Sequence, residues 1–206
     1  TIEKVRTVAI QLESGRLPVP ISVIKEEDVD ATLGADALAK SLVAGYIGLI
    51  LVGFYMLAYY RIPGLMASLA LISYTLITLA IFKLVPVTLT LAGVAGFILS
   101  VGMAVDANVL IFERTKEELR TGRGLANAIE IGFSRAWSSI RDSNVATFIT
   151  CIILFWFGTR FGASMVAGFA VTLFIGVAVS MFSAIVISQT LLRLCASTPL
   201  RKVPNL

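Results

Sequence analysis

The stretch VTLTLAGVAGFILSVGMAVDANVLIF, residues 87–112, decides the fold class of this 206-residue chain. Asp106 is the only charged residue in it. The hydrocarbon core of a membrane is about 30 Å thick, and a helix needs roughly 20 apolar residues to cross it. The stretch therefore predicts a transmembrane helix that carries a single carboxylate.

Four further apolar stretches, residues 42–60, 64–82, 143–157 and 165–192, are typical of membrane spans. The third of these is short, and the last is long enough to tilt or to emerge from the bilayer. In the whole chain 57% of residues are hydrophobic and 15% are charged, whereas a soluble domain has about 25% charged residues. This composition excludes a disordered tail, a disulfide scaffold and an ordinary cytosolic enzyme. We predict an all-α membrane protein, a polytopic bundle of five transmembrane helices.

The loops between the spans predict the orientation, because cytoplasmic loops are enriched in Lys and Arg. One side has Arg61, six basic residues in the segment 113–141 and three after the last span, whereas the other side has only Lys83 and Arg160. This asymmetry of ten to two places the C-terminus in the cytoplasm and the N-terminus outside. It also accounts for the net charge of +4, so no nucleic-acid partner is expected.

Residues 1–41 differ from the rest because they carry five basic and seven acidic residues. Residues 17–24 are typical of a proline-bounded β-strand, and one strand with little apolar mass cannot form its own core. We interpret residues 1–41 as the C-terminal end of an extracytoplasmic α+β domain, a short remnant of a larger body. Residues 42–195 then form the transmembrane domain, and residues 196–206 form a cytoplasmic tail.

The basic segment 113–141 contains apolar residues at helical spacing. They are Leu125, Ile129, Gly132, Phe133, Ala136, Trp137 and Ile140. This spacing predicts an amphipathic helix that lies in the membrane interface, with Gly122 and Gly124 as the hinge that leads into it.

Asp106 is the main candidate functional residue. It lies seven residues before Glu113, and therefore about 10 Å inside that end of its span. A carboxylate at this depth costs at least ~2.5 kcal/mol on insertion scales and must face protein or water. Two roles stay open: a buried hydrogen bond between helices, or reversible protonation, since a low dielectric favours the neutral acid. Gly102, one turn earlier on nearly the same face, is expected to let another helix approach the carboxylate.

The fourth span carries a polar stripe within an arc of roughly 120°, at about 100° per residue. Its members are Ser143, Asn144, Thr147, Thr150 and Cys151. The stripe is expected to face other helices, where it either lines a water path or joins the helices by hydrogen bonds. Asp142 lies outside the arc beside Arg141, and it is a helix N-cap, a partner of the arginine or a proton relay. The N-cap is the simplest of these interpretations.

The last span has small residues at a strict four-residue spacing. They are Ser164, Gly168, Thr172, Gly176, Ser180 and Ala184. Because small residues let helix backbones approach closely, we expect this ridge to pack against a helix, either within the chain or in a partner.

No catalytic site, metal site or cofactor is expected. The chain has no histidine, and Cys151 and Cys195 are 44 residues apart without a metal-binding spacing. P-loop, HExxH and GxSxG motifs do not occur in it. We therefore do not expect an enzyme, and the energy source must be an ion gradient or a partner ATPase.

Residues 102–114, GMAVDANVLIFER, resemble the SecD family, the accessory subunits of bacterial protein export. The resemblance continues at residues 116–120, 138–144, 168–172 and 180–182, and upstream at residues 17–20 and 33–36. It thus covers nearly the whole chain. One departure is Asp-Ser-Asn at residues 142–144, where the family commonly has Asp-Ala-Asn.

This resemblance implies spans two to six of a six-span half of the RND superfamily. The other half would be a SecF-like membrane half, which carries the family's functional arginine. The resemblance also implies residue roles: proton coupling at Asp106, Asn108, Asp142 and Asn144, and helix packing at Gly102, Gly168, Thr172, Gly176 and Ser180.

In function, the resemblance implies a bacterial cytoplasmic-membrane subunit that couples the proton gradient to late preprotein translocation. Its partners would be the SecYEG translocon, SecA, the translocating preprotein and membrane lipid, with protons as the coupling ion. Two alternatives stay open: an RND-type exporter of lipids or small amphiphiles, and a passive scaffold of the translocon. A scaffold role predicts that Asp106 is dispensable.

Overall fold

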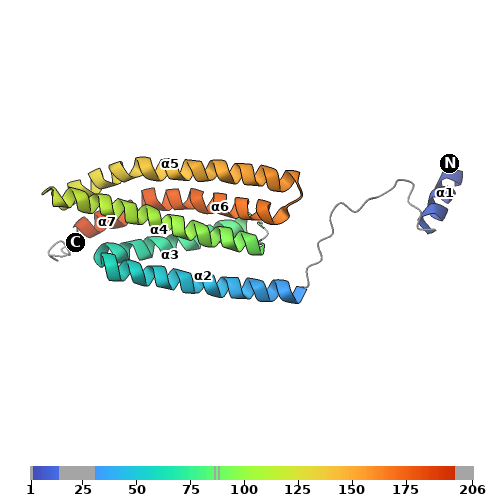
Figure 1. The fold of residues 1–206 in the computed structure, drawn as a ribbon, viewed down its shortest axis with the longest axis horizontal. Helices are drawn as coiled ribbons and strands as arrows, with labels where there is room; N and C mark the ends of the chain where they lie inside the picture. The colour runs from blue at the N-terminus through green and yellow to red at the C-terminus, as the bar shows by residue number, and fades with distance from the viewer. Residues whose placement is uncertain (1, 14–30, 86, 88, 198–206) are drawn as a thin grey trace. The chain divides into compact units, whose positions relative to one another are not determined.

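The computed structural model describes residues 2–13, 31–85, 87 and 89–197 (Figure 1). The chain divides into two units, residues 1–33 and 34–206, and each is described by itself. The first unit contains α1 (Ile2–Glu13), whose described side chains are exposed. The predicted strand over residues 17–24 lies outside the described residues, as do residues 198–206 of the predicted tail over 196–206.

The second unit is a bundle of long helices. Four of its helices each contain a stretch long and apolar enough to cross a membrane: α2 (Ala31–Tyr60), α3 (Ile62–Leu84), α4 (Leu91–Arg120) and α5 (Leu125–Arg160). The fifth candidate span comprises α6 (Ser164–Phe182), the π-helix η1 (Ser183–Ser188) and α7 (Gln189–Ser197). The predicted fold class is confirmed, because the described residues form a helical membrane bundle without strands.

The helix α4 lies at the centre of the bundle, and α2 lies at its edge (Figure 1). In the most apolar 18-residue stretch of α4, 44% of the residues are buried, whereas in the corresponding stretch of α2 only 6% are buried. The helix α4 contacts α3, α5, α6 and η1, and its Ile111 is fully buried. The residues next to Asp106 on α4 are therefore held from several sides.

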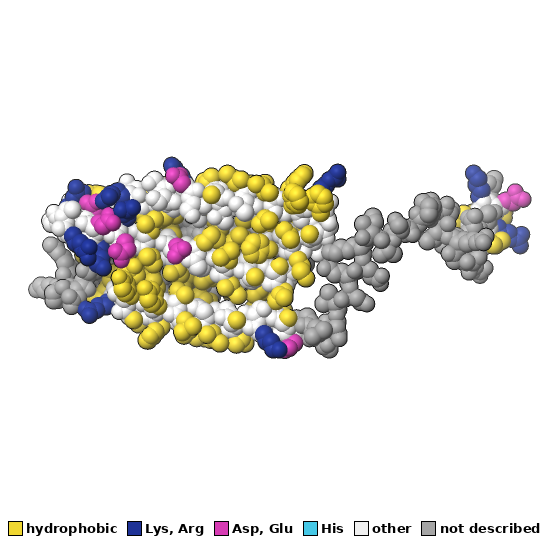
Figure 2. Space-filling view, viewed as in Figure 1, with side chains coloured by type: hydrophobic (Ala, Val, Ile, Leu, Met, Phe, Trp, Pro, Cys, Tyr) yellow, Lys and Arg dark blue, Asp and Glu magenta, His cyan; other side chains and the backbone are white. Residues whose placement is uncertain are grey.

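The surface of the bundle is divided as a membrane protein requires. Hydrophobic side chains cover its middle, whereas charged side chains gather at the end where α4 meets α5 (Figure 2). Near this end Tyr55 and Tyr59 stack with ring centroids 5.8 Å apart. At the opposite end of α5, Trp156 contacts Phe157, which stacks on Phe161. Aromatic rings are enriched at both membrane interfaces, so these two groups mark the expected boundaries of the bilayer.

The segment 113–141 differs from the expected interfacial helix. The helix α4 continues to Arg120, and α5 begins at Leu125 and runs without a break to Arg160. On the apolar face of this segment, Ile129, Ala136 and Ile140 are buried in one cluster with Ile111 and Phe112 of α4. A Cβ atom on Gly132 would lie 2.7 Å from the Cα atom of Thr115, so only glycine allows this close crossing of α5 over α4. The expected hinge is a turn in which Gly122 has a positive φ of 84°, a conformation that glycine adopts readily.

Candidate functional site around Asp106

The Asp106 side chain is exposed and lies at an open cavity of about 110 Å³ between α4 and α5. The lining residues are Met103, Asp106, Ala107 and Leu110 of α4, and Ser139, Ile140, Ser143 and Asn144 of α5. The carboxylate thus shares its cavity with the hydroxyl groups of two serines and the amide of Asn144. These groups can hydrogen-bond a water molecule or a protonated carboxyl group.

The described residues leave the face of α4 that carries Asp106 uncovered next to Gly102. Gly102 is exposed, and a Cβ atom built on it would have no atom within 4 Å in the described structure. The helix that Gly102 was expected to admit therefore does not come from the described residues. An intramembrane carboxylate must face protein or water, so this face needs a second body or a water-filled space.

Asn108 points away from Asp106. Two residues correspond to about 200° around a helix, and Asn108 is accordingly buried on the opposite side of α4. Its Oδ1 atom accepts a hydrogen bond of 2.6 Å from the hydroxyl group of Ser188 in η1. Asn144, by contrast, is buried and lines the same cavity as Asp106. Of the four residues expected to act in proton coupling, only Asp106 and Asn144 lie together.

The interpretation of Asp142 as an N-cap is wrong, because it lies in the interior of α5. It instead pairs with Arg141, whose Nε atom donates to the Asp142 carboxylate at 3.0 Å. Both side chains are more than half exposed, and exposed pairs of this kind contribute at most about 1 kcal/mol. Asp142 does not line the Asp106 cavity.

The polar stripe of α5 is only partly enclosed. Asn144 and Cys151 are buried, whereas Ser143 and Thr150 are exposed. The hydroxyl group of Thr150 donates to the carbonyl of Ala146 in the same helix. The stripe therefore borders the open face of the bundle, and its contribution to the cavity comes from Ser143 and Asn144.

The small-residue ridge of α6 packs against α4 of the same chain. A Cβ atom on Gly176 would lie 2.2 Å from the Oγ atom of Ser100, and one on Gly168 would lie 2.9 Å from the Oγ1 atom of Thr90. Thr172 of α6 also packs closely on α4. A Cβ atom on Gly96 of α4 would lie 2.5 Å from the Oγ1 atom of Thr172. Ser180 is also buried. Of the two possibilities left open by the sequence, the structure therefore shows contact within this chain.

The structure adds polar contacts that sequence reasoning missed. The hydroxyl groups of Tyr74 and Ser100 are 2.6 Å apart and fully buried, and Ser188 holds Asn108 as described above. Near the end of α4, the buried carboxylate of Glu118 forms an ion pair with Arg135 of α5. It also pairs with Arg123, whose Nη1 atom lies 3.0 Å from the Glu118 Oε2 atom. In the sequence, Tyr74, Ser100, Asn108 and Ser188 are visible only as polar residues inside apolar spans, which does not identify their partners, and Glu118 lies in a charged segment.

A metal centre is not supported by the part of the chain that the structure describes. No group of three or more Cys, Asp or Glu residues in these ranges could hold a metal ion.

Comparison with known proteins shows which protein family the chain is similar to. A family model described as "Protein export membrane protein SecD/SecF, C-terminal" matches residues 14–198. The chain is 59% identical over 197 residues to the protein translocase subunit SecD of Thermobaculum terrenum, covering 96% of this chain and 38% of that protein. It is 61% identical over 193 residues to the SecD subunit of Dehalococcoides mccartyi, covering 93% of this chain and 43% of that protein.

A solved structure shares this architecture. The crystal structure of SecDF in a super-membrane-facing form has a TM-score of 0.75 and 40% sequence identity to this chain. The similarity covers 95% of this chain and 26% of that one. The chain thus spans about two fifths of the length of the two SecD relatives and about a quarter of the SecDF chain.

Proposed function

Because this chain belongs to the SecD/SecF family of protein-export membrane proteins, we propose that it couples the proton gradient to a late stage of preprotein translocation. In this proposal Asp106 gains and loses the proton. The chain is a multi-pass membrane protein with a role in protein export. The proposed orientation places the N-terminus outside and the C-terminus in the cytoplasm, as the basic residues favour.

The observation that carries the proposal is the position of Asp106 on a face of the central helix that the described residues leave uncovered. An isolated carboxylate in an apolar span is costly, and a carboxylate with a purely structural role would be expected to bond within its own bundle. Asp106 instead lies beside an open cavity with Ser143 and Asn144. Next to it, Gly102 leaves space for another helix.

We propose that a SecF-like membrane half covers this face and completes the proton path, with a basic side chain opposite Asp106. Ser143 and Asn144 would orient water or the protonated carboxyl group by hydrogen bonds. Asn108, which binds Ser188, would not contact the proton and would instead hold α4 on the last span. The wider partners in this proposal are SecYEG, SecA and the preprotein, and the coupling ion is the proton without a further cofactor.

The test is Asp106→Asn in the full protein with its partner half, assayed by preprotein export under an imposed proton gradient. Asparagine keeps the size and the hydrogen bonding of the side chain but cannot titrate, so we expect the gradient-dependent part of export to be lost. Asp106→Glu keeps a titratable group and should retain partial activity. Asp142→Asn is the matched control, because this exposed residue lies outside the cavity and should have a milder effect.

Expression and binding of the partner half are measured for each variant to exclude misfolding. Full gradient-dependent export by Asp106→Asn would contradict the proton role and would favour a passive scaffold.

A further inference from the structure

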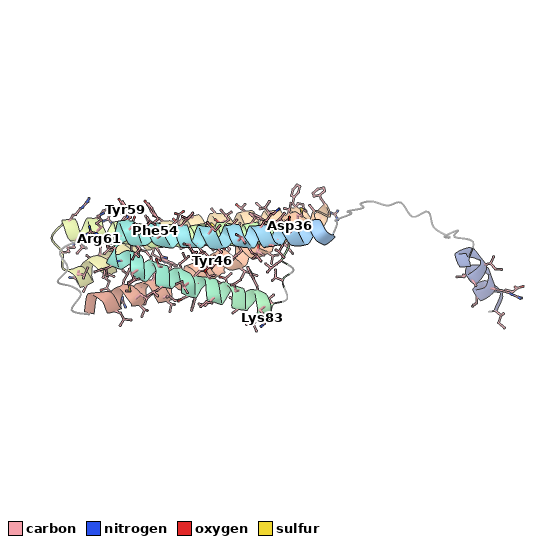
Figure 3. All side chains as sticks on the ribbon, turned by 90° about the horizontal axis from the view of Figure 1, so that it is seen from below. Asp36, Tyr46, Phe54, Tyr59, Arg61 and Lys83 are labelled. Atoms are coloured by element: carbon pink, nitrogen blue, oxygen red, sulfur yellow. The ribbon has the colours of Figure 1, made fainter. Side chains whose placement is uncertain are left out.

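The helices α2 and α3 enclose an open groove of about 460 Å³ that is separate from the Asp106 cavity. The two helices join at Arg61 and diverge toward Asp36 and Lys83, with Tyr46 and Phe54 along α2 between these ends (Figure 3). Leu57 and Leu65 line the groove next to the join, four residues on either side of Arg61.

The groove is suited to hydrocarbon. Its lining is formed mainly by Leu, Ile and aromatic side chains. The two hydroxyl groups of α3 in it are already satisfied, because Ser68 donates to the carbonyl of Gly64 and Thr75 to that of Leu71. Apart from the phenol group of Tyr46, a polar or charged occupant would find few hydrogen-bond partners here to replace those it makes with water.

The length of the groove matches one leaflet of a bilayer. Its lining on α2 runs from Tyr46 to Leu57, and on α3 from Leu65 to Leu76. Each is an interval of 11 residues, or about 16 Å along a helix, which is half of the ~30 Å hydrocarbon core. A single acyl chain spans one leaflet, so it can lie along the whole length of this groove.

Arg61 lies in the turn that joins α2 and α3, four residues from the lining residues Leu57 and Leu65, and so brings a positive charge next to this end of the groove. Its side chain is exposed, and its backbone has a φ of 53°. A residue other than glycine at such a positive φ is strained, and strain of this kind gathers at functional sites. The turn geometry favours glycine here, yet the chain has an arginine. Basic sites between transmembrane helices bind anionic lipid headgroups.

We propose that the groove between α2 and α3 binds an anionic phospholipid. Arg61 contacts its phosphate, and one acyl chain lies along Leu57, Phe54 and Tyr46. The lipid comes from the leaflet at the Arg61 end of the bundle, which is the cytoplasmic leaflet in the proposed orientation. This proposal needs only the membrane location of the chain and is independent of proton coupling.

The experiment measures lipid retained by the purified full-length protein. The protein is equilibrated in nanodiscs of phosphatidylglycerol and phosphatidylcholine in equal amounts, extracted gently and examined by native mass spectrometry. Arg61→Gly should fold at least as well as the original, because glycine tolerates the positive φ. It should retain about fivefold less phosphatidylglycerol, which corresponds to ~1 kcal/mol per basic residue at an anionic surface. Arg61→Lys should recover most of the retention.

A second pair of variants tests the acyl-chain part. Gly53 lines the groove, and a Cβ atom on it would meet only Ser68, at 3.9 Å. Gly53→Leu should therefore fill the groove and lower the retention of both lipids. Gly48→Leu is the matched control on the same helix, since a Cβ atom there has nothing within 4 Å and Gly48 does not line the groove.

Three results would overturn the proposal. The first is unchanged retention in Arg61→Gly or in Gly53→Leu. The second is an equal loss of phosphatidylglycerol in Lys83→Gln, which removes a cation at the other end of α3 and would indicate unspecific surface charge. The third is a photocrosslinker at Phe54 that captures a protein helix rather than lipid, which would identify the groove as a protein interface.

Discussion

Asn108 and Ser188 are 80 residues apart in sequence and share a buried hydrogen bond of 2.6 Å. The bond joins α4, two residues after Asp106, to the last residue of the π-helix in the final span. π-Helices are rare and occur frequently at functional sites. The side of α4 opposite Asp106 is thus fixed by a specific polar contact, so the uncovered side of the same helix has a defined orientation.

This relationship predicts a measurable coupling energy. Ser188→Ala leaves the buried Asn108 amide without its donor, and we expect a loss of about 1 kcal/mol in the free energy of unfolding. The double mutant with Asn108→Ala should show a coupling of ~0.6 kcal/mol, the average for polar pairs between membrane helices. Equilibrium unfolding in mixed micelles measures both.

Ser73→Ala is the control for this pair. Its hydroxyl group is exposed and donates to the carbonyl of Leu69 in its own helix, so its removal should change stability by less than about 0.5 kcal/mol. A coupling energy of zero between Asn108 and Ser188 would show that the bond does not hold α4 in place.

The second prediction concerns the crossing of α6 over α4. Gly176→Leu places its side chain where Ser100 and Tyr74 already lie, because even a Cβ atom would be 2.2 Å from the Ser100 Oγ atom. Overpacking of this kind costs typically ~1–3 kcal/mol, and we expect a lower melting temperature of the solubilised protein.

Gly102→Leu is the matched variant, since the Cβ position of Gly102 is open. It should leave the stability of the isolated chain nearly unchanged and weaken assembly with the partner half, as measured by co-purification. Equal destabilisation of the isolated chain by both variants would contradict the assignment of Gly102 to an uncovered face.

The third prediction concerns the carboxylate that joins the ends of α4 and α5. The side chain of Glu118 is only 7% exposed and binds both Arg135 and Arg123. Glu118→Gln removes the charge from these contacts and should cost about 1.5–3 kcal/mol, as for hydrogen bonds to charged groups. Glu117→Gln is the control on the same helix, because its side chain is 49% exposed and its pairs with arginine are worth less. Both variants are compared by thermal unfolding. If Glu117→Gln lowered the stability more than Glu118→Gln, the buried carboxylate would not be what joins these helices.

The membrane bundle could be predicted from the sequence because span length and apolar composition follow directly from the thickness of the bilayer. The ridge from Gly168 to Ser180 could also be predicted, since a four-residue spacing of small residues indicates close packing whatever the partner. Which helix takes the ridge depends on tertiary structure, and this became clear only from its contact with Ser100 and Thr90.

Other features were not predictable for physical reasons. An apolar stripe at Leu125 to Ile140 looks the same whether it faces lipid or another helix, so the sequence did not show that this segment continues α5. Single polar residues such as Asn108 and Ser188 have no periodic signal that pairs them. The location of Asp106 in its span was predictable from the apolar length, but its exposure depends on which faces of α4 the chain itself covers.

The last prediction concerns the orientation of the bundle in the membrane. The helix α5 has 36 residues from Leu125 to Arg160, or about 54 Å, which exceeds the ~30 Å hydrocarbon core. Its two ends must therefore emerge on opposite sides of the membrane. Cysteine at Thr121, in the turn before α5, should be labelled by a membrane-impermeant reagent only from the cytoplasmic side. Cysteine at Phe161, which is 66% exposed just after α5, should be labelled only from outside.

The labelling uses a background in which Cys151 and Cys195 are replaced. Phe161 is preferred to Gly158 as the outer position, because a side chain at Gly158 would meet the backbone of Ala167 at 2.7 Å. The direction follows from the excess of Lys and Arg at the end that includes Arg61 and the turn between α4 and α5. Labelling of both positions from one side would refute the five-span topology, and labelling with the two sides exchanged would refute the proposed orientation while leaving the bundle intact.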